Sequence, residues 1–182
     1  MQTENLLQKQ LHQEQSKKAP IYDTLRNQWL KSNDEELFAS CTMESFQASG
    51  PGGQKRNRKY SAVRIIHTPT TLSVISSETR SQSNNRRIAL KKLRIKLAVE
   101  IRGPGISLDR LKIGLSNLEY PLWIALLFDK LWDFKFSIGK TSESLGISTS
   151  ILIKLVARDS NIWKIINYNR ENLGLHKLNH PK

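Results

Sequence analysis

Apolar and β-branched residues gather in short runs in the first half of the chain, a pattern that predicts strands. Residues 61–67 (SAVRIIH) and 72–77 (LSVISS) are two such runs, and the turn-forming sequence TPTT joins them, so we expect a β-hairpin. A strand is also predicted around Phe38–Phe46, after a short amphipathic helix over Ile21–Leu30. Residues 1–20 are polar and rich in glutamine, and we expect them to be a mobile or weakly helical segment.

A long helix is predicted from near Ser83, because apolar residues there recur at spacings of three and four positions. These residues are Leu90, Leu93, Leu97 and Ile101. Basic residues occupy much of the remaining helix surface. The sequence GPG, Gly103–Gly105, is expected to end the helix and to mark a domain boundary.

Helical spacing alone continues through the second half of the chain. One apolar helix is expected to begin near Pro121, two short helices are expected to meet at Gly146, and a further helix is expected within residues 161–175. The predicted fold class is therefore α+β. A small α+β domain over residues 21–102 is followed by an all-α domain over residues 103–182.

The sequence around Gly146, GKTSESLGISTSILIKLVAR, resembles a helix-turn-helix. Gly146 would lie at the turn, with the small residue Ser142 four positions before it. The expected core residues are Leu145, Ile147, Leu152 and Leu155. Two interpretations stay open: a nucleic-acid contact, or a helical hairpin that packs on its own core or docks a protein.

Positive charge is concentrated in one block of the chain. The net charge is +13, from 29 basic and 16 acidic residues. Residues 49–102 carry 13 basic and 2 acidic residues, whereas residues 1–48 carry 5 and 7 and residues 103–182 carry 11 and 7. A concentration of this kind indicates a polyanionic partner, most often a nucleic acid bound through its phosphates.

This block opens with a glycine-rich loop, SGPGGQKRNRKYSAV, at residues 49–63. Glycine lets the backbone approach a ligand closely, and proline stiffens one point of the loop. The phosphate-binding pattern GxxxxGK[ST] is absent, and no strand-to-helix GxGxxG supports a dinucleotide site. The loop therefore predicts a different use of close backbone approach.

The wider pattern resembles the catalytic domain of class I peptide chain release factors. It comprises SGPGGQ, Asn57, SAVRIIHTPT and SETRSQSNNRRIAL, within residues 46–97. In that family the loop enters the peptidyl transferase centre of the large ribosomal subunit and promotes hydrolysis of the peptidyl-tRNA ester. The resemblance implies that Gly52, Gly53 and Gln54 are the catalytic tripeptide. It also makes Gln54 a candidate for N5-methylation by a glutamine methyltransferase, and it implies no cofactor.

The resemblance also gives the positive charge a target, the large-subunit rRNA and the acceptor end of peptidyl-tRNA. We expect RNA contacts from residues after the tripeptide and at the start of the long helix, and we expect some of the helix cations to be ordinary solvated surface. The candidates are Lys55, Arg56, Asn57, Arg58, Lys59, Arg64, Arg80, Arg86 and Arg87.

About 45 residues precede the loop, too few for the domain with which a full release factor reads a stop codon. The expected function is therefore codon-independent peptide release from stalled ribosomes, as in the short rescue factors of the family. The very basic tail of those factors has no counterpart in the mildly basic end of this sequence. Two alternatives remain: action on damaged or split ribosomes, and a non-catalytic protein that binds ribosomes or nucleic acid and keeps the loop as a structural relic.

Targeting and metal signals are weak in this sequence. The N-terminus lacks the apolar segment of a signal peptide, and no apolar run is long enough to cross a membrane. Cys41 is the single cysteine, which indicates a reducing compartment, and we expect the cytoplasm. His176 and His180 lack a third ligand nearby, so no metal site is expected.

Overall fold

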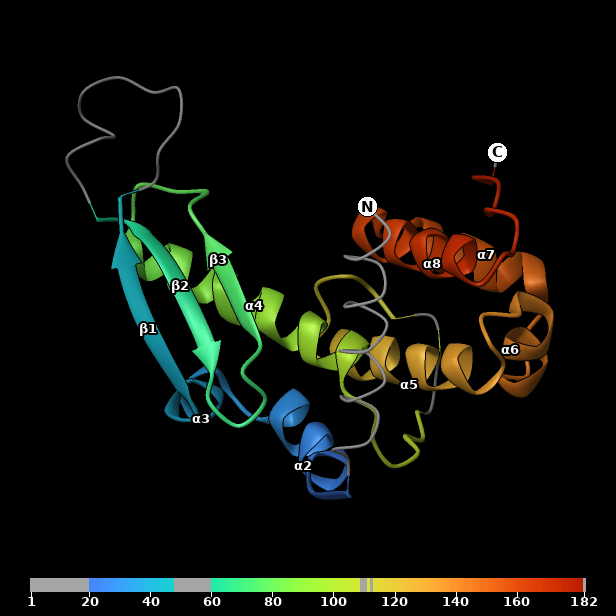
Figure 1. The fold of residues 1–182 in the computed structure, drawn as a ribbon, viewed down its shortest axis with the longest axis horizontal. Helices are drawn as coiled ribbons and strands as arrows, with labels where there is room; N and C mark the ends of the chain where they lie inside the picture. The colour runs from blue at the N-terminus through green and yellow to red at the C-terminus, as the bar shows by residue number, and fades with distance from the viewer. Residues whose placement is uncertain (1–19, 48–59, 109–110, 112, 182) are drawn as a thin grey trace, which may run out of the picture. The chain divides into compact units, whose positions relative to one another are not determined.

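The chain divides into two compact units, the first ending at Pro104 and the second beginning at Gly105 (Figure 1). The computed structural model describes residues 20–47, 60–108, 111 and 113–181. The expected mobile or weakly helical segment at residues 1–20 falls almost wholly outside these ranges. Within them, no helix combines the length and the apolar character that a membrane span requires.

The first unit is a three-stranded antiparallel sheet with one long helix packed on it (Figure 1). The sheet order is β1-β2-β3. In chain order the elements are α2 (Pro20–Lys31), α3 (Asp34–Ala39), β1 (Cys41–Phe46), β2 (Ala62–His67), β3 (Ser73–Ser76) and α4 (Gln82–Glu100). The hairpin predicted from the sequence is β2 and β3, and the predicted long helix is α4.

The core of the first unit lies between α4 and the sheet. Val63, Ile65 and His67 alternate along β2 and are fully buried, as expected for one face of a strand. From α4, the buried apolar side chains are Ala89, Leu90, Leu93, Leu97 and Ala98. The leucine stripe predicted from the sequence is thus the face of α4 that covers the sheet, whereas Ile101 lies just beyond the helix as its C-terminal cap.

The strand predicted to begin at Phe38 begins at Cys41 instead, because residues 34–39 form the short helix α3. Asn33 caps this helix: its Oδ1 accepts the Glu36 backbone N–H at 2.9 Å, and Glu36 Oε2 accepts the Asn33 N–H at 3.0 Å. This reciprocal pair satisfies two donors that the first helical turn otherwise leaves free. Local capping therefore overrides the extended pattern up to Ala39.

Buried arginines tie the helices of the first unit together. Arg94 on α4 donates to Asp34 Oδ1 at 2.5 Å and to the Ser32 carbonyl at 2.9 Å, which fixes the connection between α2 and α3. Arg26 on α2 is fully buried and donates to the Ile101 carbonyl at 3.0 Å, where the chain leaves α4. These bonds hold the middle of α2 and the junction of α2 and α3 against α4 and the residue that follows it.

The second unit is helical throughout its regular structure. Its helices are α5 (Tyr120–Asp133), α6 (Ile138–Ser144), α7 (Thr149–Ala157) and α8 (Ser160–Asn172), and each packs on the next. The apolar helix expected near Pro121 is α5, and it is buried along almost its whole length, so it forms the core of this unit. The predicted fold class, a mixed α+β domain followed by a helical part, is confirmed.

The turn between α6 and α7 is a glycine-terminated helix end. Gly146 has φ 67°, a left-handed conformation that suits glycine. The Ile147 N–H donates to the Ser142 carbonyl and the Gly146 N–H to the Glu143 carbonyl, both at 3.0 Å. Leu152 and Ser142 are buried, as the helix-turn-helix resemblance predicts for a core and a close-packed small residue, while the other three expected core residues are half-buried.

Candidate functional site

The predicted catalytic tripeptide lies between two paired strands. Gly52, Gly53 and Gln54, together with the predicted RNA contacts Lys55, Arg56, Asn57, Arg58 and Lys59, fall outside the described residues. The described residues give the base of this segment. The β1–β2 ladder ends with Phe46 opposite Ala62, so residues 47–61 connect two adjacent antiparallel strands at one end of the sheet.

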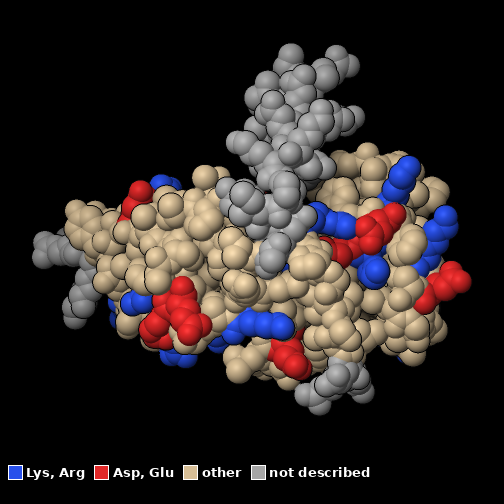
Figure 2. Space-filling model, turned by 90° about the horizontal axis from the view of Figure 1, so that it is seen from below, with Lys and Arg blue, Asp and Glu red and all other residues tan. Residues whose placement is uncertain are grey.

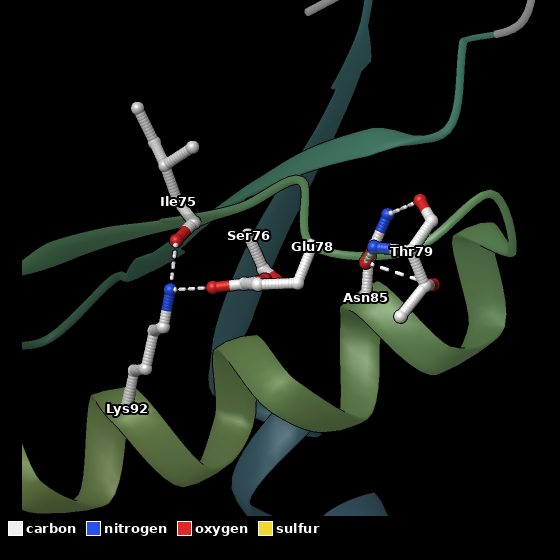
Figure 3. Close-up of polar contacts among 6 residues, drawn as sticks. All are labelled: Ile75, Ser76, Glu78, Thr79, Asn85 and Lys92. Carbon is white, nitrogen blue, oxygen red and sulfur yellow. Dashed lines mark hydrogen bonds and ion pairs between the residues drawn. The ribbon is translucent and has the colours of Figure 1, made fainter. Parts of the chain in front are cut away.

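One buried side chain, Asn85 in the first turn of α4, holds the C-terminal side of this base (Figure 3). Its Nδ2 donates to the Ser61 carbonyl at 2.7 Å and to the Thr79 carbonyl at 2.8 Å. Its Oδ1 accepts the Thr79 N–H at 2.9 Å and the Thr79 hydroxyl at 3.0 Å. The amide therefore joins three segments: the entry to β2, the loop after β3 and the start of α4.

A second polar network holds the same loop after β3 (Figure 3). Lys92 on α4 donates to the Ile75 carbonyl at 3.1 Å and forms an ion pair with Glu78, whose carboxylate also accepts the Ser76 hydroxyl. Burial would raise the pKa of Glu78, but the hydrogen bonds from Lys92 and Ser76 outweigh it and hold that pKa at about 2. Glu78 is therefore ionised at neutral pH.

Two of the predicted RNA contacts that the structure describes are engaged within the fold. Arg64 on β2 pairs with Glu44, its cross-strand neighbour on β1, at 3.2 Å. The guanidinium of Arg86 lies 3.7 Å from the centroid of the Phe38 ring, a cation–π contact between α4 and α3. Arg86 thus packs against the fold with its charge over an aromatic face.

The other two predicted contacts, Arg80 and Arg87, are exposed and make no ion pair or hydrogen bond with any residue that the structure describes. Lys91, one helical turn beyond Arg87, shares this state. Lys91 was absent from the predicted contacts, although the i, i+4 spacing from Arg87 would have identified it. Among the described cations of α4 and of the loop before it, these three are available to an external anion.

Charge on the described surface is mixed rather than uniformly basic. On the face shown in Figure 2, acidic and basic side chains are interspersed. Ion pairs explain part of this mixture, since Lys92, Lys96 and Arg94 of α4 pair with Glu78, Glu100 and Asp34. Net charge alone therefore overstates the number of free cations on the first unit.

Asn85 and Glu78 were missed from the sequence as site residues. The signal for Asn85 was present, because it continues the four-residue spacing of Ala89, Leu93 and Leu97 onto the buried face of the helix. A polar residue on such a face must find partners within the protein. Among the described residues, no cluster of three or more histidine, cysteine, aspartate or glutamate side chains could hold a metal ion.

Comparison with known proteins places a family domain over the first unit. Residues 37–104 match the family model of the RF-1 domain. Peptide chain release factor 1 of Mycoplasma pneumoniae is 49% identical over 59 residues, which are 32% of this chain and 16% of that protein. Peptide chain release factor 1 of Acidiphilium cryptum is 47% identical over 64 residues, or 35% and 18% of the two chains.

A peptide chain release factor 2 is similar to this chain to the same degree and over a similar length. Peptide chain release factor 2 of Staphylococcus haemolyticus is 48% identical over 56 residues, 31% of this chain and 15% of that protein. The chain thus spans less than a fifth of the length of these relatives. Residues 37–104 are thus similar to the RF-1 domain, and the relatives named here are peptide chain release factors of both numbered types.

Proposed function

We propose that this chain promotes hydrolysis of the peptidyl-tRNA ester on the ribosome and so releases the nascent peptide. The observation that supports this most is the position of Gly52, Gly53 and Gln54 within an RF-1 domain. They lie in the connection between β1 and β2, whose base is fixed by the strand ladder and by Asn85. Relatives named as peptide chain release factors are 48–49% identical to this chain over 56 to 59 residues, which supports the same interpretation.

The chemistry suits these residue types. Ester hydrolysis develops negative charge on the carbonyl oxygen, and one backbone N–H aimed at it typically contributes about 3 to 4 kcal/mol of transition-state stabilisation. Gly52 and Gly53 allow backbone to approach the ester closely. The side-chain amide of Gln54 would orient the attacking water and exclude larger nucleophiles, and the ribosome and tRNA supply the remaining groups.

We propose that the partners are large-subunit rRNA at the peptidyl transferase centre and the acceptor end of peptidyl-tRNA. The basic residues that follow Gln54, Lys55 to Lys59, would lie on RNA phosphates beside the tripeptide. On α4 and the loop before it, Arg80 and Arg87 are favoured as contacts because they are exposed and unpaired within the described structure. Arg64 and Arg86 are weaker candidates, since Glu44 and Phe38 already engage them.

For the ribosomal state, we favour codon-independent release from stalled ribosomes. A helical unit follows the RF-1 domain, and a glycine-terminated turn joins its helices α6 and α7, as the predicted helix-turn-helix would require. This unit offers a surface for recognising the ribosome that is separate from the catalytic domain. Methylation of Gln54 by a glutamine methyltransferase is part of the same proposal, since it would act on the residue that enters the active centre.

The test is peptide release from ribosomes stalled on an mRNA that lacks a stop codon. The wild-type chain is expected to release the peptide, and Gln54→Ala is expected to lose most of that activity. Equal release by both chains would reject catalysis. Release on damaged or split ribosomes, but not on intact stalled ones, would replace the stalled-ribosome proposal with that alternative.

A further inference from the structure

We propose that Asn85 is a positioning residue for peptide release, acting through the backbone of Ser61 and Thr79. This inference rests on the proposed function, because it concerns the rate at which the domain promotes ester hydrolysis. The tripeptide itself lies outside the described residues, so the role is argued through the backbone that follows it. Its role would be to fix where the chain enters β2, seven positions after Gln54.

The geometry leaves Asn85 no freedom. The side chain is fully buried, and both its amide hydrogens and its carbonyl oxygen are engaged, with four hydrogen bonds between 2.7 and 3.0 Å. Both amide donors are thus used, and the oxygen accepts the Thr79 N–H; the single hydroxyl hydrogen of Thr79 is shared between this oxygen and the Ser81 carbonyl, each 3.0 Å away. One rigid group therefore sets the distance from α4 to Ser61 and to Thr79 at once.

The surroundings make α4 a fixed platform for this contact. Lys92, about two turns further along α4, fixes Ile75 and Glu78 on the strand and loop that lead to Thr79 (Figure 3). On the other side, Ser61 precedes Ala62, which is paired with Phe46 in the sheet. Ser61 is thus held between a hydrogen-bonded strand and a helix whose own position is fixed by buried leucines.

Only asparagine satisfies this environment. Aspartate at position 85 has the same shape, but its carboxylate would face the carbonyl oxygens of Ser61 and Thr79 without a hydrogen to donate. Two buried acceptors would lose their partner, and the strand entry would shift away from α4. Glutamine keeps the amide but moves it by one methylene, so it would restore the bonds only with displacement of the backbone.

A displacement at this base matters if the tripeptide must be held against the ester. A misplacement of about 1 Å by a residue remote from the chemistry can lower a rate by about 100-fold. A residue that only stabilised the fold would lower activity in proportion to the unfolded fraction. A positioning role therefore predicts a lower rate of peptide release from variant protein that is fully folded, whereas a purely stabilising role predicts the wild-type rate from that protein.

Leu97→Ala is the matched control. Leu97 is fully buried on the same helix, twelve positions from Asn85, and its side chain has no polar atom that could bond to Ser61 or Thr79. Its truncation leaves a cavity in the core and destabilises the domain without altering the base of the loop. Both variants are made in the full chain and compared at a temperature where circular dichroism shows each to be folded.

The experiment measures kcat and KM for peptide release from stalled ribosomes. Asn85→Asp is expected to lower kcat by about 100-fold with KM within about threefold of the wild type. Leu97→Ala is expected to keep the wild-type kcat, and Asn85→Gln to recover part of the loss. If Asn85→Asp does not fold, the Asn85→Gln variant decides, and an unchanged kcat there overturns the proposal.

Further outcomes separate this inference from the proposed function. Wild-type kcat in folded Asn85→Asp, or an equal loss in Leu97→Ala, would overturn the positioning role alone. Absence of release by the wild type on every ribosome tested would contradict the proposed function and this inference with it. A loss confined to KM would also overturn it, because it would place Asn85 in ribosome binding instead.

Discussion

His67 should make the stability of the first unit depend on pH below neutrality. The side chain lies at the end of β2 with no exposed surface, and its ring meets Trp29 edge to face, with centroids 4.5 Å apart. Its Nδ1 is 2.8 Å from the Thr70 hydroxyl, and its Nε2 is buried without a partner among the described residues. Burial disfavours the charged imidazolium and lowers the pKa of His67 from 6.5 to about 4.

The sign and size follow from this pKa difference. Between pH 6.5 and 4 the unfolded chain binds a proton at His67 that the folded chain does not bind, so stability falls as pH falls. The contribution is fully present above pH 6.5 and is lost as the pH approaches 4. With about 1.4 kcal/mol per pKa unit, the loss is about 3 kcal/mol.

Urea unfolding at several pH values between 7 and 4.5 measures this effect, with His67→Leu as the control. The control removes the titrating group, so its free energy of unfolding should fall less steeply with pH than that of the wild type. NMR titration of the imidazole gives the pKa directly. If the free energy of unfolding depends on pH equally in the two proteins, or if the imidazole titrates near 6.5 in the folded state, burial of His67 does not link its protonation to unfolding.

Three further predictions concern single substitutions. Gly146→Ala should lower the free energy of unfolding of the second unit by about 1 kcal/mol, measured by thermal unfolding, because φ at Gly146 is 67°. The added Cβ would meet no atom within 4 Å, so the cost is backbone strain alone, and unchanged stability would contradict this. Gly103→Ala should cost the first unit more, because the added Cβ would lie 2.6 Å from the guanidinium of buried Arg26, and a loss no larger than that at Gly146 would refute the clash. Arg87→Gln should weaken ribosome binding and reduce the slope of log affinity against log salt by about 0.7 to 1, whereas Arg64→Gln should change it less; equal slopes in both variants would count against the assignment of free cations.

The sequence predicted the elements that depend on repeated spacing. The leucines of α4 and the β-branched runs of β2 and β3 each repeat a pattern over several residues. The element can therefore be predicted even where one residue departs from the pattern. Helix α3 was missed because it depends on a single capping pair, Asn33 and Glu36, rather than on a repeat. Such a short helix is stabilised by its cap and not by an apolar stripe.

The state of individual cations could not be predicted in the same way. Arg64 is neutralised by Glu44, twenty positions earlier in the sequence, only because the strand register places the two residues opposite each other. Arg86 and Arg87 are adjacent in sequence, yet one packs over Phe38 and the other is exposed. Which charges remain free depends on tertiary contacts that a charge count does not contain.

The central claim is that the Gly52-Gly53-Gln54 segment of this RF-1 domain promotes peptide release. Its most direct measurement is the single-turnover rate of peptidyl-tRNA ester hydrolysis on stalled ribosomes, with wild type and Gln54→Ala at saturating concentration. We predict rapid hydrolysis by the wild type and a single-turnover rate at least about tenfold lower in Gln54→Ala. Equal rates for the two chains, at equal ribosome occupancy, would contradict it.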